Sequence, residues 1–143
     1  MTMRTVSEIH GTKKIYAVSE TLTVQEAAQM MFEHDIGALM VVDKKGTLHG
    51  IVSERDIVRK GVATRCNLCD LTVGEVMTRK IMVCNPDDTY QTGLAKMREA
   101  NCRHLPIVKD GKPLGMVSMR DLMGESISEC HFDVTMLKNY IAS

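Results

Sequence analysis

The hydrophobic and polar positions of the chain follow one order twice. In each half, a short apolar strand precedes a segment with apolar residues at helical spacing, as at Val24, Ala27 and Met31, which predicts an amphipathic helix. Two apolar segments around a short polar turn come next and predict a β-hairpin, and a second helix begins after it. The sequence therefore predicts an α/β fold made of two tandem βαββα repeats. The strands are expected at 15–18, 39–43 and 48–53, then at 81–84, 105–108 and 114–118, with helices from Thr23, Ser53, Thr89 and Ser118.

The two halves also align with each other when the chain is displaced by about 66 residues. Four blocks match in order, with a one-residue slip in the hairpin turn, and chance does not produce such a series. The matched blocks are 5–9 with 72–76, 15–18 with 81–84, 38–42 with 104–108, and 50–56 with 115–121. The expected boundaries are 1–62 for the first repeat with a lead-in helix, 63–71 for a linker, 72–127 for the second repeat, and 128–143 for a C-terminal helix.

Short helices are predicted before each repeat and at the C-terminus. Thr5 and Thr72 each precede a glutamate by three residues, which is the spacing of a capping box at a helix start. From Phe132 to Ile141, apolar residues recur at helical spacing and predict the C-terminal helix. Its apolar stripe is made of Met136, Leu137, Tyr140 and Ile141.

The composition is that of an ordinary folded protein. Of 143 residues, 44% are hydrophobic and 25% charged, and the formal net charge is zero, whereas a surface for nucleic acid or anionic membrane needs a basic excess. We therefore expect neither as a partner. No apolar run reaches the ~20 residues of a membrane span, and the first residues show no secretory signal. Five cysteines, an odd number, form no disulfide pattern, which favours a reduced, cytoplasmic protein.

One motif, Gly–apolar–apolar–Ser–x–x–Asp, occurs at the same place in both repeats, where a strand ends and a helix begins. Serine caps a helix start and aspartate in the first turn complements the helix dipole, so each copy alone fits a structural role. The same groups suit a nucleotide, because a helix start attracts phosphate, a carboxylate accepts ribose hydroxyls and arginine pairs with phosphate. Two copies in register favour the ligand-binding interpretation. The residues are Ser53, Arg55 and Asp56, and Ser118, Arg120 and Asp121.

This motif, with a preceding strand such as 103–108, resembles the cystathionine-β-synthase (CBS) domain, present here as a pair over residues 5–127. The second repeat fits the family pattern best, and the whole is similar to small free-standing CBS-pair proteins. The resemblance implies two repeats packed with pseudo-two-fold symmetry, with two clefts that bind adenosyl ligands such as AMP, ADP, ATP or S-adenosylmethionine. It also implies a homodimer whose modules meet through their helices, with the C-terminal helix adding to that interface.

The resemblance further assigns positions in the clefts. Asp56 and Asp121 would hold ribose, with Ser53 and Ser118 beside the ribose or phosphate. Adenine would lie against the first strand of a repeat and meet the segment just before a hairpin. The contacts would come from Tyr16 or Met82, and from Ile36, Gly37 and Ala38 or Cys102, Arg103 and His104.

The two repeats differ in that segment. The second contains Arg103 and His104, which match phosphate-reaching positions of the family, and the proline of the family pattern, Pro106; the first has neither the cation nor the proline. Together with Arg120, these cations favour a phosphorylated ligand over S-adenosylmethionine, while NADH stays open. His104 can reach either cleft, so the cleft that would hold a polyphosphate also stays open.

No P-loop, dinucleotide-binding, metalloprotease or Ser-His-Asp motif is present. We therefore predict a sensor that regulates an unidentified partner protein, not an enzyme. An alternative rests on Cys66 and Cys69, a CxxC pair in the linker that would serve in thiol redox chemistry or as half of a metal site. Cys130 and His131 would then supply the remaining zinc ligands. The βαβ context of a thioredoxin-like site is missing, so two thiols in a loop are the simpler interpretation.

Overall fold

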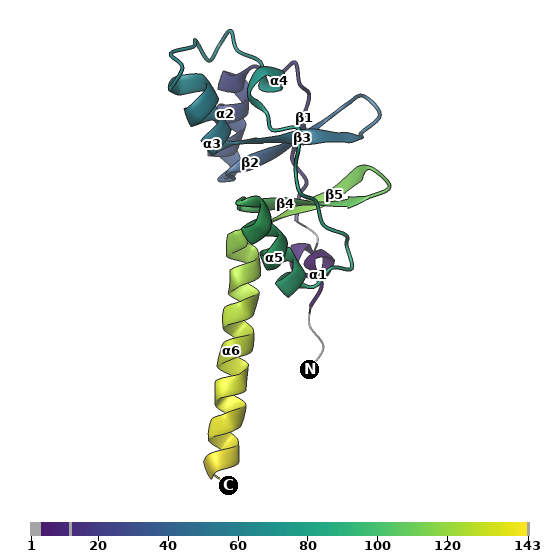
Figure 1. The fold of residues 1–143 in the computed structure, drawn as a ribbon, viewed down its shortest axis with the longest axis vertical. Coiled ribbons are helices and arrows are strands. Elements are labelled where there is room, and N and C mark those ends of the chain that lie inside the picture. The colour runs from purple at the N-terminus through teal and green to yellow at the C-terminus, as the bar shows by residue number, and fades with distance from the viewer. Residues whose placement is uncertain (1–3, 12, 143) are drawn as a thin grey trace.

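The computed structural model describes residues 4–11 and 13–142, with their side chains except those of 129–133 and 142 (Figure 1). The order of elements confirms an α/β fold of two tandem repeats. The first half holds α1 (Val6–His10), β1 (Ala17–Val18), α2 (Val24–His34), β2 (Ala38–Val42), β3 (Leu48–Ser53), α3 (Glu54–Asp56) and the π-helical η1 (Ile57–Val62). The second half holds α4 (Val73–Val76), α5 (Tyr90–Ala100), β4 (His104–Lys109), β5 (Lys112–Ser118) and α6 (Met119–Ala142).

The lead-in helices begin at the two threonines that the sequence singles out. The hydroxyl of Thr5 accepts a hydrogen bond from the backbone N–H of Glu8 at 3.1 Å. The backbone N–H of Thr72 donates to the carboxylate of Glu75 at 2.8 Å, and its hydroxyl donates to the same carboxylate at 3.2 Å. Each bond satisfies a polar group that a helix start would otherwise leave unpaired.

The strands form two small sheets that face each other, with the helices of each repeat on the outer sides (Figure 1). β1 pairs in parallel with β2, and β2 is antiparallel to β3; β4 and β5 form the second, antiparallel sheet. In the hairpins, Ala38 lies opposite Ser53 and His104 lies opposite Ser118. The motif serine and the segment before each hairpin are therefore neighbours at one end of each sheet.

The first strand of each repeat is shorter than the sequence predicts. β1 covers two residues, and the expected strand over 81–84 is corrected to a single bridge between Cys84 and Ile107 of β4. The preceding residues, Ile81 and Met82, line a cleft between the repeats instead of extending the sheet. Apolar character alone cannot distinguish a strand from a cleft wall, because both bury the same side chains.

Two apolar cores, one in each repeat, are formed by the described residues, and the lead-in helices are exchanged between them. Val6 of α1 is buried in the second core, and its N–H donates to the carbonyl of Asp88 at 2.8 Å. Val73 of α4 is buried in the first core, and its N–H donates to the carbonyl of Leu22 at 2.8 Å. The predicted boundary at 62 divides the repeats in sequence only, since each core includes a helix from the other half.

The exchange requires glycine at the start of both motifs. A Cβ on Gly115 of β5 would lie 2.5 Å from Nε2 of His10, the last residue of α1. A Cβ on Gly50 of β3 would overlap the backbone carbonyl oxygen of Thr78, in the segment that follows α4. At Gly50 only a residue without a side chain allows this close approach of a backbone, whereas at Gly115 the ring of His10 would have to turn aside.

The helix after Ser118 and the predicted C-terminal helix form one continuous helix, which corrects the expectation of a separate element from Phe132. No proline interrupts α6, and Gly124 alone does not end it, because a single glycine only weakens a helix. The helix leaves the body of the molecule and projects away from it (Figure 1). Among the described residues, no helix has the length and apolarity needed to span a membrane.

Candidate ligand clefts

Two clefts lie between the repeats in the described part of the chain, and each is built from both of them. Cleft 1 has a volume of about 1330 Å³ and cleft 2 of about 560 Å³. Cleft 1 combines the motif of the first repeat with the segment before β4, and cleft 2 combines the motif of the second repeat with the segment before β2. Cleft 1 includes Ser53, Arg55, Asp56, Met82, Cys102 and Arg103; cleft 2 includes Tyr16, Ile36, Ala38, Ser118, Arg120 and Asp121; Gly37 and His104 line both.

The sequence-predicted site residues therefore gather as the resemblance implies, except for Pro106. Pro106 is buried in β4 and lines neither cleft, which corrects its assignment. Its carbonyl accepts the N–H of Cys84 at 2.9 Å, so the residue holds the second repeat together instead. A proline at this position, opposite Met116, has no N–H to give to the sheet and is tolerated because β4 is short of a full neighbouring strand there.

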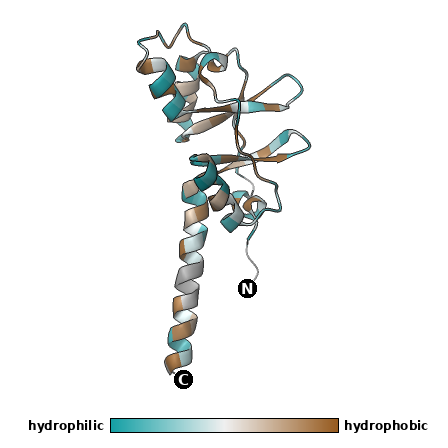
Figure 2. Cartoon of the chain, viewed as in Figure 1, coloured by the Kyte–Doolittle hydropathy of each residue, from teal (hydrophilic) through white to brown (hydrophobic). Residues whose placement is uncertain are grey.

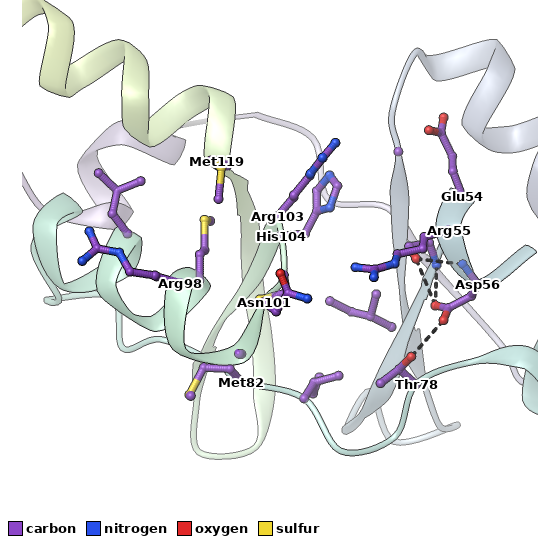
Figure 3. Close-up of a pocket in the computed structure, with 18 of the residues that line it drawn as sticks. Glu54, Arg55, Asp56, Thr78, Met82, Arg98, Asn101, Arg103, His104 and Met119 are labelled. Atoms are coloured by element: carbon purple, nitrogen blue, oxygen red, sulfur yellow. Dashed lines mark hydrogen bonds between the residues drawn. The ribbon is translucent and has the colours of Figure 1, made fainter. Parts of the chain in front are cut away.

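Asp56 is held firmly at the wall of cleft 1, where it is only 8% exposed. One carboxylate oxygen accepts the N–H and the hydroxyl of Ser53 at 3.0 and 3.1 Å. The other accepts the hydroxyl of Thr78 at 3.0 Å and lies 3.4 Å from Nζ of Lys60. The capping role is therefore real, and it also fixes the orientation of the carboxylate toward the cleft (Figure 3).

Asp121 occupies the matching place in cleft 2. One of its oxygens accepts the N–H of Ser118 at 3.0 Å, and the other pairs with Nζ of Lys13 at 3.1 Å. Partial burial alone would raise the pKa of Asp121, but the bonds from Ser118 and Lys13 outweigh it and lower the pKa below its ordinary value. Asp121 is thus ionised at neutral pH, and its ion-pair partner comes from the exchanged lead-in segment.

Cleft 1 is strongly cationic. Figure 3 shows Arg55 and Asp56 of the first repeat on one side and Arg103, His104 and Asn101 of the second on the other. Among its described lining residues, the cations outnumber the carboxylates by six to two. Such a surface favours an anion with several negative charges. The cations are Arg55, Arg59, Lys60, Lys80, Arg98 and Arg103; the carboxylates are Glu54 and Asp56.

Several of these residues have no role in the sequence-based site. Thr78, Lys80 and Arg98 reach cleft 1 because the segment after α4 crosses β3 and because α5 ends beside the hairpin. One signal was visible in the repeat: a basic pair precedes the first strand in both halves, at 13–14 and at 79–80. Lys13 and Lys14 line cleft 2 as Lys80 lines cleft 1, so the pairs are equivalent.

His104 stands between the two clefts. A Cβ on Gly37 would lie 3.5 Å from Cε1 of its ring, an ordinary contact distance, so the imidazole lies close to the segment before β2. Burial lowers the pKa of His104, Glu54 and Asp121 act to raise it, and Arg103 acts to lower it further; the net direction is downward. The ring is therefore mostly neutral at neutral pH and can donate or accept a hydrogen bond toward either cleft.

The thiols lie apart from these features. Cys66 and Cys69 are both exposed in the linker between η1 and α4, and the side chains of Cys130 and His131 lie outside the described residues. Within the described part, no cluster of three or more His, Cys, Asp or Glu side chains is arranged for a metal ion. Cys102 lines cleft 1, and burial raises the pKa of its thiol, which disfavours the reactive thiolate.

A sequence model of the CBS domain matches residues 6–63 and 73–128. The chain belongs to the CBS-domain family. A 17.7 kDa uncharacterised protein of Acidianus ambivalens is 40% identical over 118 residues, which cover 82% of this chain and 70% of that protein. A solved protein with CBS domains from Burkholderia ambifaria has a TM-score of 0.82 and 36% identity, covering 87% of this chain and 95% of the other.

A further similar structure contains ligands. The CBS domain pair of protein MJ0100, solved in complex with 5′-methylthioadenosine and S-adenosyl-L-methionine, has a TM-score of 0.81 and 26% identity. The match covers 90% of this chain and 99% of the other. Adenosyl compounds are thus bound by a CBS pair of the same fold.

Proposed function

We propose that this CBS pair is a cytoplasmic sensor that binds AMP, ADP or ATP in its clefts, acts as a homodimer and regulates a partner protein. The observation that carries the proposal is the composition of cleft 1. A carboxylate fixed at a helix start, Asp56, lines the same cleft as apolar residues such as Met82 and as a cationic wall that includes Arg103. A carboxylate suits a ribose, an apolar surface suits an adenine, and a cationic wall suits a phosphate chain.

The nucleoside part of the ligand is matched by the carboxylate and the apolar residues. An ionised carboxylate only accepts hydrogen bonds, and a ribose offers two neighbouring hydroxyl donors. Thr78 now donates to one oxygen of Asp56, so a bound ribose replaces or joins that bond. The adenosyl compounds in the MJ0100 complex support this part of the proposal, since both contain an adenine and a ribose.

The phosphates distinguish the proposed ligands from S-adenosylmethionine. Arginine binds phosphate oxygens through paired N–H donors, and Arg55 and Arg103 enter cleft 1 from different repeats. S-adenosylmethionine has a positively charged sulfonium, which such a wall repels. We therefore assign the polyphosphate to cleft 1, which is also more than twice as large as cleft 2.

The regulatory step follows from the position of the clefts. A ligand that touches Asp56 and Arg103 bridges the two repeats and favours one distance between them over others. The resulting shift in population is limited by the difference in ligand affinity between the two arrangements. A partner protein that binds one arrangement more tightly would then respond to the nucleotide concentration. A two-fold homodimer presents two equivalent surfaces for such a partner.

The experiment is isothermal titration of the pure protein with ATP, AMP, S-adenosylmethionine and NADH. Asp56→Asn and Asp121→Asn test the clefts one at a time, and Asp110→Asn, in the exposed hairpin turn, removes a carboxylate outside both. We expect ATP to bind wild type and Asp110→Asn alike, and about tenfold more weakly to Asp56→Asn. Thermal unfolding checks each variant, because Asp56 also caps α3.

The outcomes separate the parts of the proposal. Preferential binding of S-adenosylmethionine or NADH would refute the assigned ligand class while retaining the clefts. If Asp110→Asn and Asp56→Asn lost affinity for ATP equally, the clefts would not account for ATP binding. No binding of any of the four compounds would overturn the sensor function.

A further inference from the structure

One side chain is common to the two clefts. Among the described residues, Gly37 and His104 are the only two that line both, and Gly37 has no side chain. His104 is half-buried at the start of β4, opposite Ser118 of the second motif. Brown apolar residues recur along the strands of the two facing sheets (Figure 2), so a charge on the imidazole is screened less than a charge at the open surface. A charge on this ring therefore acts on both clefts.

Backbone hydrogen bonds fix the surroundings of the ring on both sides. The N–H of Glu54, the first residue of α3, donates to the carbonyl of Gly37 at 3.0 Å. The N–H of Met119, the first residue of α6, donates to the carbonyl of Arg103 at 2.7 Å. A Cβ on Gly37 would lie 3.6 Å from Nε2 of His104 and 3.7 Å from Cδ of Glu54, so the imidazole and this carboxyl group approach the same point. The backbone of both repeats thus sets the place of the ring.

Charged groups from both clefts act on the imidazole. Burial lowers the pKa of His104, and the net direction stays downward although Glu54 of cleft 1 and Asp121 of cleft 2 act to raise it. The neighbouring Arg103 acts in the same direction as burial. Asp121 is itself paired with Lys13 at 3.1 Å. The ring is therefore mostly neutral at neutral pH, and a further negative charge beside it favours its protonation.

We propose that His104 couples the two clefts through one shared proton: a phosphate group bound in either cleft recruits the proton to the imidazole, which then attracts a phosphate group in the other cleft. The proton is taken from the solvent and is released again with the ligands. The proposal rests on the adenine nucleotides of the proposed function and adds that their binding in the two clefts is positively cooperative. Because such coupling is reciprocal, a ligand in cleft 2 strengthens binding in cleft 1 by the same factor.

The coupling has a defined dependence on pH. At neutral pH the ring of His104 is mostly neutral until a phosphate group binds, so the first ligand changes the charge that the second one meets. At about pH 9 the ring stays neutral in every state of ligation, and well below its lowered pKa it is protonated before any ligand binds. In both limits the first ligand leaves the charge on the ring unchanged, so the cooperativity that it supplies disappears.

Methionines in the two clefts allow the occupancy of each to be followed separately. Met82 lines cleft 1 and Met116 lines cleft 2, so carbon-13 labels on the methionine methyl groups of the full chain report both in one NMR titration. The probe is AMP, the smallest of the proposed nucleotides. Wild type, His104→Gln and His49→Gln are titrated at about pH 7 and about pH 9. His49→Gln is the matched control, because His49 is exposed on β3 and lines neither cleft.

At pH 7 we expect AMP in one cleft to strengthen binding in the other by about fivefold, both in wild type and in His49→Gln, which is the low end of ordinary allosteric coupling. The factor should fall to about one in His104→Gln, and in wild type at pH 9. Clefts that fill independently in wild type at pH 7, a single cleft that fills, or coupling that persists in His104→Gln would overturn the coupling and leave the proposed nucleotide binding intact. No response of either methionine to AMP or ATP would overturn both.

Discussion

The close crossing at Gly50 gives the sharpest test of how the repeats are joined. Gly50 lies in β3 opposite Val41, where the segment after α4 passes over the strand. An added Cβ would lie 2.5 Å from Cε of Met77 and closer still to the carbonyl oxygen of Thr78. That backbone is held by two bonds to Ile51, at 3.0 and 2.8 Å, so it cannot move aside without losing them.

The expected cost of Gly50→Ala follows from those contacts. Two backbone hydrogen bonds contribute about 1 kcal/mol each, and forcing a methyl group into a filled space costs roughly 1–3 kcal/mol. We therefore expect the free energy of unfolding to fall by about 3–5 kcal/mol, a large share of the ~5–15 kcal/mol of a typical domain. Displacement of Thr78 also breaks its bond to Asp56, so one of the contacts that orient this carboxylate is lost as well.

Urea unfolding followed by circular dichroism measures the change. Gly124→Ala is the matched control, because nothing lies within 4 Å of its added Cβ on α6, and alanine there should stabilise the helix by about 0.5–1 kcal/mol. Gly115→Ala is expected to cost less than Gly50→Ala, since a ring of His10 can turn where a backbone cannot. A loss below about 1 kcal/mol in Gly50→Ala would refute the crossing of the lead-in segment over β3.

Three further predictions concern titrating groups. Lys13→Met should raise the pKa of Asp121 toward its ordinary value, and carboxyl NMR measures this change. Because folding lowers the pKa of Asp121, its contribution to stability is present above the unfolded pKa near 4 and is lost as the pH falls through the folded pKa. His104 should take up a proton when ATP binds near pH 6.5, since phosphate raises its lowered pKa; calorimetry in buffers of different ionisation heat detects this, and His104→Gln should abolish it. Iodoacetamide should label Cys66 well before Cys84, because burial raises the pKa of Cys84 to about 11; mass spectrometry gives the order.

The repeats and hairpins could be predicted from the sequence because their signals are local. The apolar spacing from Val24 to Met31 and the polar turn before Leu48 act over a few residues, and the second copy confirmed the first. The apolar residues at 81–82 also predicted a strand, although in the structure they line cleft 1. Whether such residues form a strand or a cleft wall depends on the segments that pack against them, and the local sequence pattern does not show these segments.

Some residues of the candidate site could likewise be predicted from the sequence, and others could not. Ser53 and Asp56 were visible because their spacing is fixed by the helix start they cap. Thr78 was not, because it reaches Asp56 only through the exchange of the lead-in segments, 22 residues along the chain. The glycine of the motif gave part of this information, because a glycine within a strand can indicate a close approach by another backbone. It does not show which backbone that is.

The first turns of α6 form part of the wall of cleft 1. Met119, Met123 and Ile127 face cleft 1, and the same helix continues outward as an exposed apolar face. A helix moves as a rigid element, so a displacement of its first turn also displaces its far end. Under the proposed function, a ligand that shifts the repeats about Asp56 and Arg103 would therefore also move the exposed end of α6. The energy available to that coupling is limited to the difference in ligand affinity between the two arrangements.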